Sequence, residues 1–140
     1  MKRSSEKAGA CVSRHYVGAK TRLADVVPYI TKDGSEIREL MHPDRHGNRR
    51  QSLAEAVVPA GTRTRLHRHR ETEELYHITS GEGLLTLGEE QMRVSPGDTA
   101  LIPPGTPHCI EAIGSAALHI LCCCSPAYRH EDTELTDAPP

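Results

Sequence analysis

The sequence predicts an all-β domain, a sandwich or barrel built from short antiparallel strands. Short runs of about four to eight residues, rich in branched apolar side chains, recur along most of the chain and favour strands. Glycine, proline and aspartate separate these runs at regular intervals, as turns between strands do. No long amphipathic helical pattern interrupts them, and 140 residues suffice for one domain with its own core.

The first third of the chain is assigned as follows. Residues 1–24 are polar and weakly patterned, so we expect a flexible N-terminal arm before a barrel domain over residues 25–125. Residues 35–41 alternate in part and predict a strand, and residues 42–51 are rich in loop-forming residues. A further strand over 52–58 ends at Pro59-Ala60-Gly61.

Regularly spaced turns divide the remainder of the domain into strands. We expect strands over residues 62–69, 75–79, 84–87, 91–94, 99–102, 108–113 and 117–123. The turns between the later ones carry glycine or proline, as at Gly88-Glu89-Glu90 and Pro103-Pro104-Gly105. Residues 126–140 contain three prolines and are expected to form a polar C-terminal tail.

Composition excludes several classes of protein. A net charge of -2, with basic and acidic residues interspersed, argues against a nucleic-acid partner. No apolar stretch approaches the ~20 residues of a membrane span, and no apolar segment follows the N-terminal Met-Lys-Arg as in a secretory signal. We therefore expect a cytoplasmic protein with no membrane partner.

Five cysteines are expected to be reduced thiols that pack as small apolar residues. Cys122, Cys123 and Cys124 are adjacent, and neighbours on a strand face opposite sides, which suits neither a chelate nor a disulfide framework. The alternative is a reactive or metal-binding thiol. Cys109 fits it best because it follows His108, although strand alternation turns the two side chains apart.

Two histidines at positions i and i+2 predict a metal site on a strand. His67 and His69 share one face only if the backbone there is extended. Imidazole nitrogens together with a carboxylate bind divalent transition metals. Glu73, Glu74 and His108 are the nearby candidates for further ligands.

These residues stand in two glycine-framed motifs that closely resemble those of the cupin superfamily. The first motif is satisfied by Gly61, His67, His69, Glu74 and Gly81, and the second by Gly97, Pro103, Gly105 and His108. Only the last position of the second motif departs, with Ala112 in place of asparagine. The resemblance covers about residues 52–125 and is to a small, single-domain, bacterial-type cupin.

The resemblance implies a cupin-type double-stranded jelly-roll β-barrel with one divalent metal ion near its centre. His67, His69, Glu74 and His108 would be the ligands, and Fe, Mn, Ni, Cu, Co and Zn all suit such a nitrogen and oxygen set. Small cupins usually form homodimers in which an N-terminal strand crosses to the partner, so we expect a homodimer. The missing asparagine leaves contacts to the substrate at Ala112 open.

Strand alternation nominates two further site residues. Arg65 shares the His67 face and would bind a carboxylate or phosphate, unless it is a solvated arginine at the strand end. Tyr76 shares the Glu74 face and is either a proton donor or a lining residue without chemistry. We list both as candidate catalytic residues.

Three functions remain open from the sequence. The first is a metal-dependent enzyme for a small anionic or chelating molecule, with dioxygenase-type oxidation as the leading reaction. The second is metal-assisted isomerase, epimerase or lyase chemistry on a sugar or keto acid. The third is a non-catalytic cupin that binds a small ligand.

Overall fold

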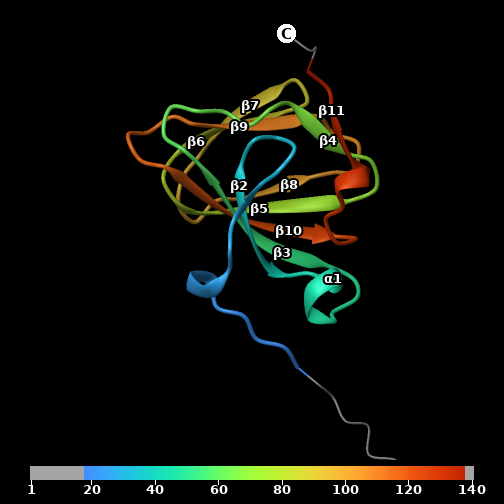
Figure 1. The fold of residues 1–140 in the computed structure, drawn as a ribbon. Helices are drawn as coiled ribbons and strands as arrows, with labels where there is room; N and C mark the ends of the chain where they lie inside the picture. Colours follow the sequence, from blue (N-terminus) through green and yellow to red (C-terminus); the bar gives the residue numbers. More distant parts are fainter. Residues whose placement is uncertain (1–17, 138–140) are drawn as a thin grey trace, which may run out of the picture.

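The computed structural model describes residues 18–137, which form a β-barrel of two facing antiparallel sheets (Figure 1). The all-β jelly-roll prediction is confirmed. The six-stranded sheet has the order β1 (Tyr29–Ile30), β2 (Glu36–Met41), β3 (Ser52–Val58), β10 (Leu118–Ser125), β5 (Glu73–Ser80) and β8 (Thr99–Ile102). The five-stranded sheet has the order β11 (Thr133–Leu135), β4 (His67–His69), β9 (His108–Ala112), β6 (Gly83–Leu87) and β7 (Glu90–Val94).

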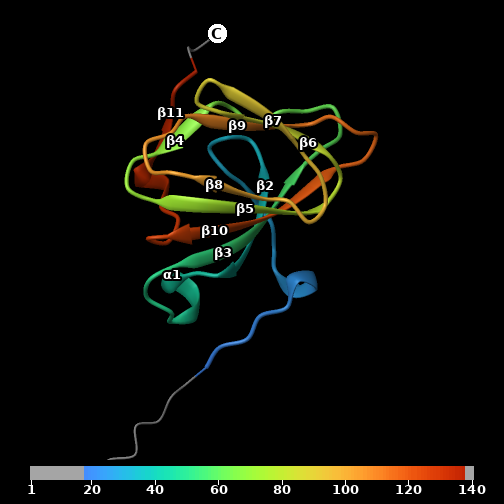
Figure 2. The same ribbon diagram turned by 180° about the vertical axis from the view of Figure 1, so that it is seen from behind.

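Within residues 18–137, three short helical turns lie outside the sheets. They are η1 (Leu23–Asp25), α1 (Pro43–His46) and η2 (His130–Asp132). Seen from behind, β3, β10 and β5 form one layer and β4, β9 and β6 the other (Figure 2). No helix within residues 18–137 is long and apolar enough to cross a membrane.

The core consists of branched aliphatic side chains, as a chain without Phe or Trp requires. Its most deeply buried members come from both sheets: Val58, Ile78, Leu85, Ile102, Ile110, Leu118 and Ile120. Their alternation along each strand sends one face of each sheet inward. Some core residues also line the internal cavity that contains the candidate site: Ile37, Ala54, Ala56, Tyr76 and Cys122.

Gly81 allows the turn between β5 and β6 to lie directly against the backbone at the start of β10. Its φ of +80° lies in the left-handed region that favours glycine. A Cβ at this position would meet the carbonyl oxygen of Ala117 and would lie 2.9 Å from the Cα of Leu118. The glycine of the first motif is therefore required by both backbone conformation and packing.

Three sequence expectations need correction. The strand expected over 62–69 is regular only in β4, because residues 61–64 pair irregularly with β9 and Arg63 forms only an isolated bridge to Glu111. The polar tail expected after residue 125 instead supplies η2 and β11, and β11 pairs with β4 through polar residues suited to a sheet edge. The loop expected over 42–51 contains α1, which begins at Pro43. The N-terminal arm falls mainly outside the described residues.

Candidate metal centre

Strands β4 and β9 bring three histidines together inside the barrel. His67 and His69 alternate inward along β4, and His67 is the register partner of His108 on β9. All three are buried, at 2%, 5% and 0% exposure. Their ligand nitrogens lie within 4.8 Å of one another, so this histidine triad can hold a metal ion.

Each imidazole is held with its Nε2 lone pair free. The Nδ1–H groups of His67 and His108 donate to the carbonyl oxygens of Arg65 and Thr106, at 2.8 and 2.9 Å. A carbonyl oxygen can only accept, so the proton in each neutral ring must be on Nδ1. Nε2 is then the metal-binding nitrogen.

The partner of His69 is a side chain from the C-terminal segment. Its Nδ1 lies 2.9 Å from the Oγ1 of Thr133, whose own proton is donated to the carbonyl of Arg129 at 3.1 Å. Thr133 Oγ1 therefore accepts from His69 Nδ1–H, which again leaves Nε2 free. Sequence reasoning missed this contact because β11 was assigned to a tail.

Glu74 completes a set of converging acceptors. Its Oε1 lies 3.3 Å from Nε2 of His69 and 3.4 Å from Nε2 of His108. Glu74 Oε1 and His108 Nε2 are buried and have no hydrogen-bond partner among the described residues. A carboxylate oxygen facing lone pairs is unfavourable unless a cation lies between them, so this donor set fits a divalent metal.

The pKa values of the site follow from burial and from these neighbours. Burial, with a smaller contribution from His108, lowers the pKa of His67. Burial also opposes protonation of His69, but the adjacent Glu74 outweighs it and raises the pKa of that imidazole. Burial opposes ionisation of Glu74, yet His108 and His69 hold its pKa well below its usual range.

Asp33 is a second carboxylate of the site that sequence reasoning missed. Its Oδ1 accepts from Thr31 Oγ1 at 2.6 Å and from the backbone N–H and Oγ of Ser35 at 2.9 and 2.7 Å. Its Oδ2 lies 3.6 Å from His67 Nε2. Asp33-Gly34 is a recognisable hairpin-turn pair, but no sequence signal shows that this turn closes over the histidines.

Of the two candidate catalytic residues, only Tyr76 lies in the cavity wall. Tyr76 lines the cavity, is 5% exposed and lies with its ring centroid 5.9 Å from that of His108. Burial raises the pKa of Tyr76 well above its usual value, so its hydroxyl stays protonated.

Arg65 lies outside the cavity, contrary to the alternation argument. Its guanidinium donates to both carboxylate oxygens of Asp137, at 2.9 and 3.1 Å, and its side chain is 46% exposed. The backbone is irregular between the buried Thr64 and His67, and Arg65 N–H donates to the carbonyl of Asp33 rather than to a neighbouring strand. Regular alternation therefore does not extend back from His67 to Arg65.

Two of the cysteines contribute to the cavity wall. Alternation along β10 sends Cys122 and Cys124 inward, and the Cys124 thiol donates to Glu74 Oε2 at 3.1 Å. Burial raises the pKa of both thiols well above the usual value, so they remain neutral. Cys109 lines a different, outer hollow and not this cavity. The cysteines of the described residues are free, as expected.

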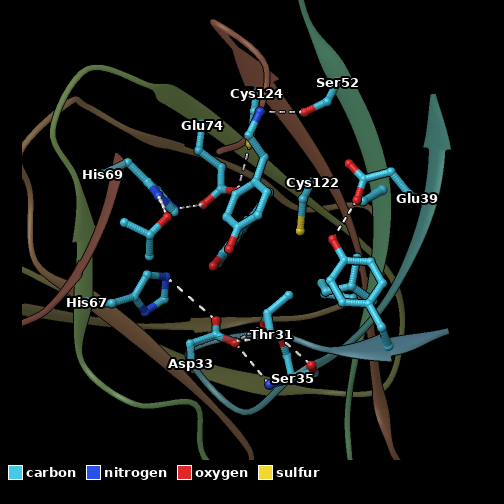
Figure 3. Close-up of a pocket in the computed structure, with 17 residues that line it drawn as sticks. Thr31, Asp33, Ser35, Glu39, Ser52, His67, His69, Glu74, Cys122 and Cys124 are labelled. Atoms are coloured by element: carbon cyan, nitrogen blue, oxygen red, sulfur yellow. Dashed lines mark hydrogen bonds and ion pairs between the residues drawn. The ribbon is translucent and has the colours of Figure 1, made fainter. Parts of the chain in front are cut away.

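The cavity holds about 510 Å³ of empty space, including its open mouth. His67 and His69 occupy one side, Glu74 and Asp33 flank them, and Glu39 lies across the cavity (Figure 3). Among residues 18–137, no lysine or arginine lines it, whereas three carboxylates do. Without a metal ion, the lining of the cavity is therefore acidic.

Comparison with known proteins agrees with this fold. The cupin domain family matches residues 54–124, and the chain belongs to this family. An uncharacterized protein of Methanocaldococcus jannaschii is 55% identical over 118 residues, covering 84% of this chain and 94% of that protein. The oxalate-binding protein of Thermotoga maritima is 28% identical over 86 residues, covering 61% of this chain and 71% of its own. The polyketide cyclase RemF of Streptomyces resistomycificus superposes with a TM-score of 0.75 at 21% identity, covering 88% of each chain.

Proposed function

We propose that the protein is a metal-dependent enzyme that performs acid–base chemistry, as an isomerase or lyase does, on a small metal-chelating molecule. The observation that carries the proposal is the buried histidine triad, whose ligand nitrogens converge, together with Glu74 Oε1 and His108 Nε2, which are buried without hydrogen-bond partners. His67, His69, Glu74 and His108 would hold the ion, and Fe, Mn, Ni, Cu, Co and Zn remain candidates. When bound, such an ion polarises a carbonyl or hydroxyl oxygen of the substrate as a Lewis acid.

Asp33 and Tyr76 are the residues that would move protons. Oδ1 of Asp33 is fixed by Thr31 and Ser35, which leaves Oδ2 available to accept a proton from a carbon next to a carbonyl group. The electron pair of the broken C–H bond forms the C=C bond of an enolate, and the π pair of the carbonyl group moves to its oxygen. In an α-hydroxyketone, return of the proton to the former carbonyl carbon, with transfer of the hydroxyl proton to the former carbonyl oxygen, gives the isomer. Where the β-carbon bears a leaving group, the oxygen pair re-forms the carbonyl, the pair from the C–H bond becomes the new Cα=Cβ bond, and the leaving group departs with the electrons of its own bond, which gives the lyase product. Tyr76, which lines the cavity and stays protonated, would donate to the oxygen that gains charge.

The charge of the cavity opposes a strongly anionic substrate. Its lining lacks lysine and arginine over the described residues, and Arg65, the candidate anion clamp, is paired with Asp137 on the surface. The T. maritima relative is named for oxalate binding, but a dicarboxylate would here face three carboxylates in addition to the metal. We therefore favour a neutral or amine-bearing chelating substrate over an anionic one.

Retention of metal tests the site. Protein purified without added metal should contain stoichiometric metal by elemental analysis, and the double variant His67→Ala/His108→Ala should contain none. His77→Ala is the matched control, because His77 binds Thr99 Oγ1 away from the triad. A double variant that keeps stoichiometric metal would refute the assignment.

Solvent exchange tests the chemistry. Metal-loaded protein in D₂O should exchange the carbon-bound proton of members of a panel of α-hydroxyketones and α-aminoketones, followed by proton NMR. Asp33→Asn should abolish this exchange. An oxygen electrode with the iron-loaded protein tests the dioxygenase alternative: oxygen uptake without deuterium exchange would overturn the acid–base proposal. Neither signal with any metal form would favour a ligand-binding protein without catalysis.

A further inference from the structure

Glu39 is a buried carboxylate that the proposed chemistry leaves without a role. It lies on β2, is 6% exposed and lines the cavity. Figure 3 shows its carboxylate pointing inward on the side opposite His67 and His69. One oxygen, Oε2, accepts from the hydroxyl of Tyr29 at 2.6 Å, while the other, Oε1, is buried without a hydrogen-bond partner.

Neighbouring groups do not neutralise this charge. The only ion-pair candidate within 4.0 Å among the described residues is His42, whose Nε2 lies 3.9 Å from Oε1. His42 Nδ1 accepts from the backbone N–H of Asp44 at 3.1 Å, so it carries no proton. His42 Nε2–H donates to the carbonyl of Tyr128 at 2.7 Å. The ring is therefore neutral, and the buried Glu39 carboxylate has no cationic partner among the described residues.

Glu39 lies where a substrate would enter. The cavity shares Tyr29, Glu39 and Tyr128 with a surface hollow that also contains His42 and Arg45. Arg45 makes no ion pair with Glu39 in the part of the chain that the structure describes. Two tyrosines beside a buried carboxylate form a suitable environment for an ammonium group, through both hydrogen bonding and cation–π attraction.

The geometry points to Glu39 as the binding site for a primary ammonium group of the substrate. This inference rests on the proposed function, because the other end of the substrate would chelate the metal. A count of formal charges supports it: the three carboxyl groups of Asp33, Glu39 and Glu74 exceed the charge of one divalent ion by one. The substrate class is thus a small molecule with a chelating group at one end and an amine at the other.

A series of chelators tests the inference. Cobalt-loaded protein would be titrated by calorimetry with ω-amino hydroxamates of increasing chain length and with alkyl hydroxamates of matched length. At one chain length, the amino compound should bind about tenfold to a hundredfold more tightly than its alkyl match, since hydrogen bonds to charged groups are that strong. Glu39→Gln should remove this preference and leave the affinity for alkyl hydroxamates unchanged.

Two further variants keep the test decisive. Glu55→Gln removes a buried carboxylate that does not line the cavity, and it should keep the preference. Glu39→Asp retracts the carboxylate by one methylene and should move the preference to the next longer amino compound. Absence of binding by every hydroxamate would refute the metal proposal, whereas equal binding of amino and alkyl compounds to the wild-type protein would refute the role of Glu39 alone.

Discussion

Replacing Thr133 by valine should weaken metal binding although residue 133 is not a ligand. Valine keeps the volume of threonine but removes Oγ1, the acceptor for His69 Nδ1–H at 2.9 Å. His69 and Thr133 are 5% and 3% exposed, so water cannot replace the lost partner. In the metal-free variant the neutral His69 ring can move its proton from Nδ1 to Nε2. A metal ion on Nε2 keeps the proton on Nδ1, where the N–H group then has no acceptor. The penalty therefore falls on the metal-bound state.

The magnitude follows from the cost of an unsatisfied buried donor. That cost is about 1–3 kcal/mol, equivalent to a loss of affinity of about fivefold to 150-fold. Loss of an outer partner of a metal-bound histidine typically costs about 10–100-fold. We therefore expect Thr133→Val to weaken metal affinity by about 10–100-fold, measured by competition with a fluorescent chelator.

Two controls separate this effect from a general loss of stability. Thr133→Ser retains the hydroxyl and should restore most of the affinity. Thr136→Val changes an exposed threonine on the same segment and should have no effect. His67 and His108 use backbone acceptors, so only His69 offers this test by a side-chain change. Wild-type affinity in Thr133→Val, with the fold intact by circular dichroism, would refute the tautomer argument.

Two further predictions concern pH and packing. Glu74 raises the pKa of His69, whereas burial lowers the pKa of His67, so His69 is the ligand that must lose a proton when the metal binds. Below the pKa of His69, metal affinity measured by chelator competition should therefore fall about tenfold per pH unit. An affinity that stays constant between pH 5.5 and 8 would contradict this. Gly81→Ala should destabilise the protein in urea unfolding by about 2 kcal/mol or more, because a Cβ there meets the backbone at Ala117 and Leu118. Gly97→Ala is the control, because Gly97 also has a positive φ but a Cβ there would meet no atom within 4 Å. This substitution should lower the free energy of unfolding by only about 1 kcal/mol. Equal losses of unfolding free energy in the two variants would exclude a packing role for Gly81.

Strand periodicity accounts for what could be predicted about the site. Alternation correctly placed His67 and His69 on one inward face and Tyr76 in the cavity wall. The glycine and proline turns gave most strands to within a few residues, because these turn residues act locally. The same rule failed for Arg65, because a short irregular segment between Thr64 and His67 interrupts the alternation.

Residues delivered by distant segments could not be predicted in this way. Asp33 reaches His67 from the turn between β1 and β2, and Thr133 reaches His69 from β11. Each contact joins residues more than 30 positions apart, and local patterns carry no information about which end of the barrel a turn or tail covers. Polar edge residues such as Thr133 and Glu134 also resemble a solvated tail until their strand partner is known.

From the sequence alone, turn residues and strand alternation predicted the all-β fold and put His67 and His69 on one face, because both depend on the local backbone. The resemblance to cupins implied that Glu74 and His108 join them. Only the tertiary structure decided the charge of the cavity. It placed Arg65 outside, brought Asp33 and Glu39 inside, and supplied Thr133 as the partner of His69. The physical reason is that the identity of a ligand depends on which polar groups are buried together, and burial is a property of the whole fold.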